Sequence, residues 1–287
     1  MTDQLMLWPY VQPEERGAKG RMKLRTRSLS ECWMSINFNR LGRAVAFLGV
    51  IGLLSVGCQG SPIAWERQTA GKPWSIQVVA DNVRAGKQAL RFEVREGDAY
   101  VSPRKTSYRS ELSAREVFRA TMGKEYWYGF SMYMPTDFPD HDNRLVIGQW
   151  HATEDIGDIK LSPVLSQRYK EGRFYVQICF SPEKVQRSDG TKKTLYSTHS
   201  FKKGVWHDFV YHVKWSYRDD GFVEMWWNGD QVIGYKGPVG YNDDEGPFFK
   251  YGIYRDDVPE TYVMYFDEFR IGSSYDEVNP AANIPVD

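Results

Sequence analysis

Cysteine is scarce in this chain, with three residues among 287. Cys32 and Cys58 fall in an N-terminal stretch that has the features of a targeting segment, which leaves Cys179 alone in the expected mature domain. A single cysteine excludes a disulfide framework. Cys179 lies in the strand-like run 174–180, and we expect it to be a strand residue and not a nucleophile.

A surplus of charge is absent too, because 37 Lys and Arg balance 37 Asp and Glu. Residues 58–287 carry 29 basic and 33 acidic side chains, which argues against a nucleic-acid partner. The five histidines show no metal-ligand spacing with cysteines and no His-Glu-x-x-His pattern, so no metal site is predicted. No cofactor is required, and the acidic segment Asp243-Asp244-Glu245 leaves calcium binding open.

Long hydrophobic runs are missing apart from residues 44–56, which are too few for a comfortable membrane span. Arg40 and Arg43 precede this run, and small residues follow it, as in a secretory signal. The segment Ser55-Val56-Gly57-Cys58 resembles a bacterial lipobox. We therefore expect lipidation at Cys58 and export as a lipoprotein anchored to the outer or cytoplasmic membrane, in the periplasm or at the cell surface. Plain secretion is the alternative.

The expected domain organisation follows from this signal. Residues 1–33 are a disordered extension or a misassigned gene start, because Met34 offers a natural beginning. Residues 34–57 are the signal peptide and residues 58–71 a tether. Residues 72–287 then form one domain, since sandwiches often exceed two hundred residues as a single unit. We expect a monomer.

Aromatic side chains are abundant, at 15% of the sequence, and hydrophobic side chains recur with a period of two. Such alternation is typical of half-buried antiparallel strands, and Asn228-Gly229 between two alternating runs is a strong hairpin signal. Only residues 113–121 could bend into a short helix. The pattern predicts an all-β, concanavalin-like jelly-roll sandwich of two antiparallel sheets with a concave substrate groove. The expected strands cover residues 88–95, 125–134, 206–215, 222–227, 231–235 and 261–271.

Three strand-like segments place polar groups on alternate positions. In the first, Arg109 and Glu111 share one face, and in the second Gln149 and His151 lie opposite Trp150. The third segment presents Lys250, Gly252 and Tyr254 on one face, and Gly252 is expected to leave room for a ligand. Considered alone, Arg109 and Glu111 have an alternative interpretation as a solvent-exposed ion pair. His151 considered alone has an alternative interpretation as a structural histidine.

Together these groups suit β-elimination from a uronic acid, in which a carboxylate is neutralised while a proton leaves the adjacent carbon. Arg109 and Gln149 are the candidates for stabilising the carboxylate, because a guanidinium fork matches its geometry. Tyr254 and His151 are the candidates for moving the proton, and we assign them jointly. Glu111, Lys250 and Gln177 are the predicted substrate-binding residues.

The segments Arg109-Ser110-Glu111-Leu112, Gln149-Trp150-His151 and Phe249-Lys250-Tyr251-Gly252-Ile253-Tyr254 resemble, in the same order, three motifs of the jelly-roll polysaccharide lyases, which include alginate, glucuronan and heparin lyases. The resemblance covers about residues 88–271. It implies proton transfer by a Tyr and a His and carboxylate neutralisation by Gln and Arg, which correspond here to Tyr254, His151, Gln149 and Arg109. Phe248, Tyr251 and Arg255-Asp256 depart from the alginate lyase motif, so glucuronan is at least as good a candidate as alginate.

Two other functions compete with a polyuronate lyase. A non-catalytic carbohydrate-binding module, similar to laminin G, could use the same sandwich, because fold does not fix function. Such a module would not need the acid–base pair of His151 and Tyr254. A sandwich glycoside hydrolase needs two carboxylates across the scissile bond, and no Glu-x-Asp-x-x-Glu segment is present.

Overall fold

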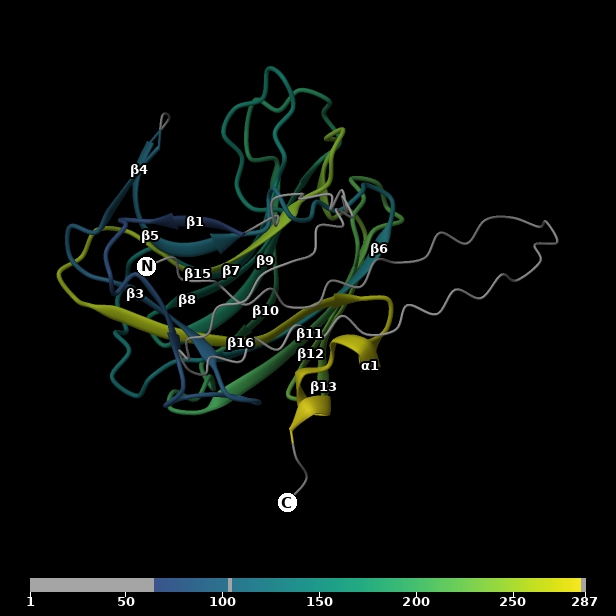
Figure 1. Cartoon of the computed structure of the whole chain (residues 1–287). Helices are drawn as coiled ribbons and strands as arrows, with labels where there is room; N and C mark the ends of the chain where they lie inside the picture. The colour runs from purple at the N-terminus through teal and green to yellow at the C-terminus, as the bar shows by residue number, and fades with distance from the viewer. Residues whose placement is uncertain (1–64, 103–104, 285–287) are drawn as a thin grey trace, which may run out of the picture. The chain divides into compact units, whose positions relative to one another are not determined.

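A computed structural model of the chain describes residues 65–102 and 105–284. These residues form two β-sheets, which appear as stacked, curved layers in Figure 1. The nine-stranded sheet has the order β1 (Glu66–Thr69), β5 (Lys105–Ser113), β15 (Phe248–Arg255), β7 (Leu145–His151), β8 (Leu165–Lys170), β9 (Arg173–Ser181) and β10 (Thr191–Thr198), with β4 (Ala99–Ser102) beside β5 and β14 (Gly240–Tyr241) beside β9.

The seven-stranded sheet has the order β13 (Asp230–Lys236), β12 (Phe222–Trp227), β11 (Trp206–Lys214), β6 (Glu125–Tyr133), β16 (Tyr262–Gly272), β3 (Ala89–Val94) and β2 (Ile76–Val79). Every strand pair in the two sheets is antiparallel except β9 with β14. After β16, the described residues form a short helix, α1 (Tyr275–Val278), and a single 3₁₀ turn, η1 (Pro280–Asn283). The predicted antiparallel sandwich is confirmed.

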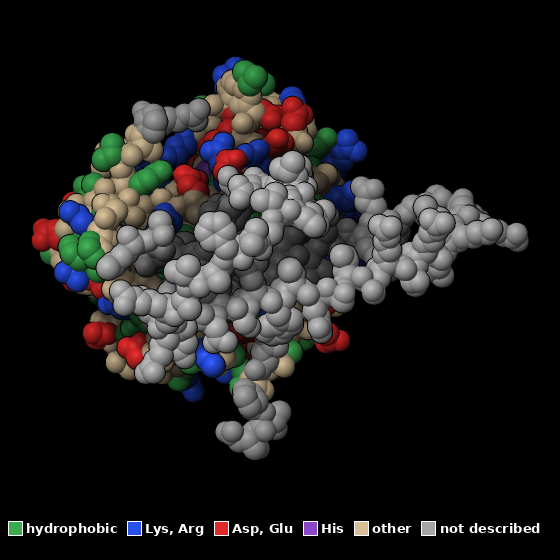
Figure 2. Space-filling view, viewed as in Figure 1, with side chains coloured by type: hydrophobic (Ala, Val, Ile, Leu, Met, Phe, Trp, Pro, Cys, Tyr) green, Lys and Arg blue, Asp and Glu red, His purple; other side chains and the backbone are tan. Residues whose placement is uncertain are grey.

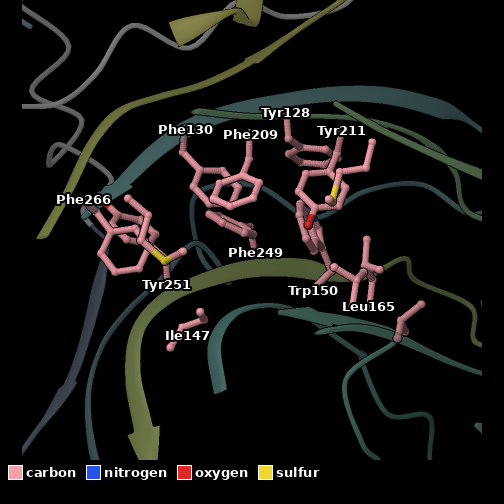
Figure 3. Packing of buried hydrophobic residues seen from close by; sticks show 14 of the residues in the cluster. Tyr128, Phe130, Ile147, Trp150, Leu165, Phe209, Tyr211, Phe249, Tyr251 and Phe266 are labelled. Atoms are coloured by element: carbon pink, nitrogen blue, oxygen red, sulfur yellow. The ribbon is translucent and has the colours of Figure 1, made fainter. Parts of the chain in front are cut away.

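The alternation seen in the sequence places aromatic side chains between the two sheets (Figure 3). Trp150 of β7 is fully buried, and its ring centroid lies 5.2 Å from that of Tyr128 and 4.8 Å from that of Tyr211. Phe249 of β15 lies 5.3 Å from Phe130. Because edge-to-face and tilted aromatic pairs add about 0.5–1.5 kcal/mol each beyond their area burial, this core fixes which face of β7 and β15 turns inward. Their polar residues must therefore turn outward.

The hairpin prediction is confirmed at Asn228 and Gly229, whose φ angles of 52° and 90° suit the tight turn between β12 and β13. Cys179 lies in β9 and is buried, and burial raises the pKa of its thiol. Its predicted place in a strand is confirmed. Residues 113–121 contain a turn after β5 and no helix.

The folded sheet begins before residue 72. Strand β1 pairs with β5 along its whole length, although its residues fall in the predicted tether 58–71. Trp65 packs edge-on against Tyr251 at 5.4 Å and against Phe269 at 5.1 Å. Residues 65–69 therefore belong to the sandwich.

The predicted extension 1–33, the signal peptide 34–57 and the lipidation site Cys58 lie outside the described residues. In the part of the chain that is described, no helix is long and apolar enough to cross a membrane. On the face shown in Figure 2, acidic and basic side chains lie intermingled around the rim, as the balanced composition leads one to expect.

Candidate active site

A row of polar residues crosses the nine-stranded sheet on the face that points away from the core. Residues directly opposite each other on neighbouring strands share a face. Lys250 on β15 lies opposite Ser113 on one side and Gln149 on the other. Gln149 lies opposite Ser166 of β8, which in turn lies opposite Gln177 of β9. The register thus places Gln177 two strands, or about 10 Å, from Gln149.

Glu111 connects the predicted residues of this face. Its carboxylate accepts hydrogen bonds from the amide of Gln149 and from Lys250 Nζ, the latter at 2.9 Å, and its Oε2 lies 3.1 Å from Arg109 Nη1. Glu111 and Lys250 are only 1% and 2% exposed. Burial opposes ionisation of Glu111, but the charges of Lys250 and Arg109 outweigh it and hold its pKa below the ordinary value.

This buried cluster orients the guanidinium of Arg109. Nε donates to Ser107 Oγ at 2.9 Å, while Nη1 donates to Gln68 Oε1 at 3.0 Å and to Glu111. Within the described residues, Nη2 has no hydrogen-bond partner. Arg109 therefore keeps two N–H donors on one nitrogen, which could bind a carboxylate from a ligand.

His151 is prepared to act as a neutral base. Its Nδ1 lies 2.9 Å from the carbonyl oxygen of Ala152, so this nitrogen donates its proton there and Nε2 keeps a lone pair. Burial, with a further contribution from the nearby charge of Lys250, lowers the pKa of His151 to about 4. The imidazole is therefore unprotonated near neutral pH, and it stacks on Phe248, which lies opposite it on β15.

Tyr254 lies opposite Arg109 on β15, and cations surround it. The guanidinium carbons of Arg109 and Arg144 lie 4.1 and 4.7 Å from its ring centroid. Lys105 Nζ lies 3.4 Å from its hydroxyl oxygen. Lys160, in the loop between β7 and β8, interacts electrostatically with both Tyr254 and Arg109. Sequence reasoning missed Lys105, Arg144 and Lys160, because they lie at strand ends or in a loop, where no periodicity marks a face.

The structure brings Arg109, Glu111, Gln149 and Lys250 into one contact network, and Tyr254 joins it through Arg109. His151 lies on the same face as Gln149, since Trp150 between them enters the core. Among the described contacts, no hydrogen bond joins His151 directly to Tyr254. The pairing of β7 and β15 places Phe248 opposite His151 and Val146 opposite Tyr254, so the two proposed proton carriers lie at different positions along the strands.

Gly252 has a different role from the one expected. The sequence suggested that it leaves room for a ligand, but a Cβ at this position would lie 2.2 Å from Ser110 O and 2.8 Å from Phe92 Cδ1. The missing side chain thus makes room for strand β5 and for the core. Its φ of 127° coincides with a register shift between β15 and β7, so Gly252 permits a bulge immediately before Tyr254.

A cavity of about 320 Å³ lies elsewhere, on the seven-stranded sheet beside α1 and η1. Asp208 and Arg84 line it and form a close ion pair with a nitrogen–oxygen distance of 2.6 Å, and Ser131 also donates to Asp208. The carboxylate of Asp208 is thus already engaged by Arg84 and Ser131, and the described cavity lining contains no histidine. The outward face of the nine-stranded sheet is therefore the better candidate for chemistry.

Comparisons with known proteins bear on the family and the fold of the chain. Residues 59–270 match the family model described as "Polysaccharide lyase". No curated protein sequence matches the chain. Among solved structures, the endo-β-1,4-glucuronan lyase from the fungus Trichoderma reesei is similar, with 19% identity, a TM-score of 0.62, and coverage of 75% of this chain and 94% of that chain.

Two further solved structures are similar. The family 7 alginate lyase A1-II′ has 14% identity and a TM-score of 0.52, covering 71% of this chain and 85% of its own. The catalytic domain of a GH131 β-glucanase from Podospora anserina has 13% identity and a TM-score of 0.54, covering 76% and 88%. At such identities these likenesses show the fold alone, and that fold carries different reactions on carbohydrates.

Proposed function

The chain belongs to the polysaccharide lyase family, and from this premise we propose that it cleaves a uronic-acid-containing glycan by β-elimination. The observation that carries the proposal is the combination on one sheet face of an oriented guanidinium with two free N–H donors, at Arg109, and an unprotonated imidazole, at His151. The first group suits a carboxylate and the second a weakly acidic C–H bond.

The proposed reaction removes the proton from C5 of the uronate and breaks the glycosidic bond at C4. Arg109, with Gln149, binds the carboxylate on C5 of the uronate and stabilises the charge that develops there. His151 and Tyr254 together handle the proton, one removing it from C5 and the other delivering a proton to the departing glycosidic oxygen. The electron pair of the C5–H bond becomes the C4–C5 double bond as the C4–O bond breaks. One product chain ends in an unsaturated uronate and the other in a free hydroxyl.

Glu111 and Lys250 would support this chemistry through their contacts with the residues that bind the carboxylate. In the structure their charged groups contact each other and the site residues Gln149 and Arg109. Substrate contacts by Glu111, Lys250 and Gln177 remain predictions. Lys250 also keeps a positive charge close to His151, which favours the unprotonated imidazole.

The proposed substrate is glucuronan or an alginate-like polyuronate. The oriented guanidinium of Arg109 supports a polyuronate over a neutral glycan, and the structures with a similar fold include a glucuronan lyase and an alginate lyase. Phe248, Tyr251 and Arg255-Asp256 depart from the alginate lyase motif and favour a glucuronate-containing chain.

The test is the absorbance of the conjugated unsaturated uronate, followed with purified protein on glucuronan, alginate, heparosan and hyaluronan in turn. We expect a rise with at least one of the four polymers. If none gives a rise while sugar binding is retained, the protein is instead a non-catalytic carbohydrate-binding module, which is the alternative function for this sandwich.

We further propose that the protein is exported and lipidated at Cys58, on the strength of the signal-like segment 34–57 and the lipobox-like residues before Cys58. Labelling of the expressed full chain with radioactive palmitate should mark the wild type and not Cys58→Ser. Equal labelling of both proteins would reject the anchor.

A further inference from the structure

Four cations from three segments gather around Tyr254. Arg109 lies in the middle of β5 and Lys105 at its first residue, while Arg144 precedes β7 and Lys160 lies in the loop after β7. Lys105 reaches the phenol oxygen and the two arginines lie over the ring. Bringing so many like charges to one neutral side chain is unfavourable unless an anion accompanies them.

The protein supplies only part of the balancing negative charge. Arg144 Nη2 pairs with Asp256 Oδ1 at 2.6 Å, and Arg109 shares Glu111 with Lys250. Among the described residues, neither Lys105 nor Lys160 has an ion-pair partner. Burial lowers the pKa of Lys160, and the charges of Arg109 and Lys105 contribute in the same direction, while Glu154 opposes them. Glu154 interacts electrostatically with Lys160 without forming an ion pair, so the charges of the two lysines near Tyr254 are only partly offset.

The loop that carries Lys160 is anchored on both sides of this residue. Ile159 N donates to Gln186 O at 3.2 Å, and Leu161 N donates to Glu154 Oε1 at 3.4 Å. Asp158 Oδ1 accepts a hydrogen bond from Gln186 N at 2.6 Å. The backbone at Lys160 is therefore fixed while its side chain stays exposed, which is the arrangement expected of a side chain that meets a ligand.

Two of these cations, Arg144 and Lys105, lie on the far side of Tyr254 from His151 along the strands. Tyr254 pairs with Val146 near the start of β7, whereas His151 is the last residue of β7. Arg144 directly precedes β7, and Lys105 lies four residues before Arg109 on β5, or about 13 Å along an extended strand. One carboxylate held by Arg109 and Gln149 leaves Lys105 and Lys160 unused.

We propose that Lys105, Arg144 and Lys160 form a second carboxylate subsite, which binds the uronate adjacent to the one that loses its C5 proton. The inference rests on the proposed lyase function and narrows its substrate. A polymer made only of uronates offers a carboxylate at both places. In unsulfated heparosan and hyaluronan the neighbouring sugar is an N-acetylated amino sugar, which carries no carboxylate. The protein therefore prefers chains of consecutive uronates.

The test compares Lys105→Met and Lys160→Met with Lys87→Met, an exposed lysine in the loop between β2 and β3. Binding is measured by calorimetry in a Tyr254→Phe background, so that no sugar is cleaved, with oligosaccharides of glucuronan and of heparosan. Loss of one charge-assisted contact, at about 1.5–3 kcal/mol, corresponds to roughly ten-fold or more weaker binding of the glucuronan oligosaccharide. Lys87→Met should bind both as the parent does, and Lys160→Arg should keep most of the affinity.

Turnover is then measured with the same lysine changes in the Tyr254-containing protein. We expect kcat/KM on glucuronan to fall mainly through KM, and the preference for glucuronan over heparosan to shrink. Equal fractional losses on both polymers, or undiminished glucuronan binding in both lysine variants, would overturn the second carboxylate subsite while leaving the lyase function intact. Selective loss of glucuronan binding, without turnover of any polymer by the unaltered protein, would uphold the subsite and overturn the lyase.

Discussion

The guanidinium carbon of Arg109 lies 4.1 Å from the ring centroid of Tyr254, its direct neighbour across the β5–β15 pairing. This stacking holds the aromatic ring through its face, and a cation at such a distance contributes about 0.5–2 kcal/mol. This stacking does not depend on the phenol oxygen of Tyr254. The position of the ring and the chemistry of its hydroxyl can therefore be tested separately.

Replacing Tyr254 by Phe should reduce turnover of the polyuronate by about 10²–10⁴-fold, because the hydroxyl can no longer exchange a proton in the reaction. The ring should remain between Arg109 and Arg144, so substrate binding should change little. The measurement is the rate of unsaturated uronate formation together with calorimetric binding. Tyr175→Phe is the matched control, since Arg173 covers its ring at 4.5 Å on the same sheet. Wild-type rates in Tyr254→Phe would remove this residue from the mechanism.

The stability of the protein should depend on pH through His151. Its pKa is lowered to about 4, whereas a histidine in the unfolded chain titrates near 6.5. Between these values the unfolded chain binds a proton that folded His151 does not, so the free energy of unfolding falls as the pH falls from 6.5 to 4, by up to about 3 kcal/mol. Urea unfolding at pH 4.5 and pH 7 measures the change.

His151→Gln lacks this titration and should lose less stability over the same interval. A drop of the same size in both proteins would show that other groups cause it. If His151 is the base, turnover in the wild type should persist well below pH 6.5, because the imidazole stays unprotonated there. An acidic limb of the rate profile near pH 6.5 would contradict the assigned environment.

Replacing Glu111 by Gln should destabilise the protein by about 3–5 kcal/mol, because buried Lys250 and Arg109 lose their shared carboxylate. Denaturant unfolding measures the effect, and adding Lys250→Met to Glu111→Gln should restore part of the loss. Glu116→Gln is the control, since this exposed residue pairs with Arg119 at 3.5 Å and should cost less than 1 kcal/mol. A neutral Glu111→Gln would mean that Glu111 is not ionised in the folded protein.

Replacing Gly252 by Ala should cost more than 2 kcal/mol, because the new Cβ meets the backbone oxygen of Ser110 at 2.2 Å and the φ of 127° strains any L side chain. Gly234→Ala in β13 is the control: its nearest atom would lie 3.8 Å away, at the end of the Gln231 side chain. Thermal unfolding of both variants should show a clearly lower midpoint only for Gly252→Ala. Equal midpoints would mean that the β15 bulge relaxes freely.

The long alternating strands of the sandwich, such as β6, β11 and β16, could be predicted from the sequence because alternation of side chains and burial of alternate residues have the same period. The core position of Trp150 and the outward position of Gln149 followed from it. Strands β1, β2, β4, β8, β10 and β14 were missed; the four residues of β1, for example, carry no long apolar pattern and are held by pairing with β5. Helix α1 was missed despite a local signal: Ser274 accepts a hydrogen bond from Glu277 N, the spacing of a capping box.

The site was only partly predictable. Arg109, Gln149 and Tyr254 could be grouped because each lies in an alternating strand. The role of Glu111 as the common partner of three side chains depends on which strands are neighbours, and β5, β15 and β7 are adjacent in space although far apart in sequence. Lys160 belongs to a loop and comes near Tyr254 only through the folded path of residues 152–164. No pattern in a linear sequence encodes such proximity.

Because of the bulge at Gly252, the number of residues in this part of β15 matters as well as their identity. From Lys250 to Tyr254 the chain advances four positions on β15, which match four positions on β5 but only three on β7. Removing or adding one residue here would exchange inside and outside for every later position of β15, and Tyr254 would enter the core. Natural variation in this part of the enzyme should therefore proceed by substitution and avoid insertions and deletions.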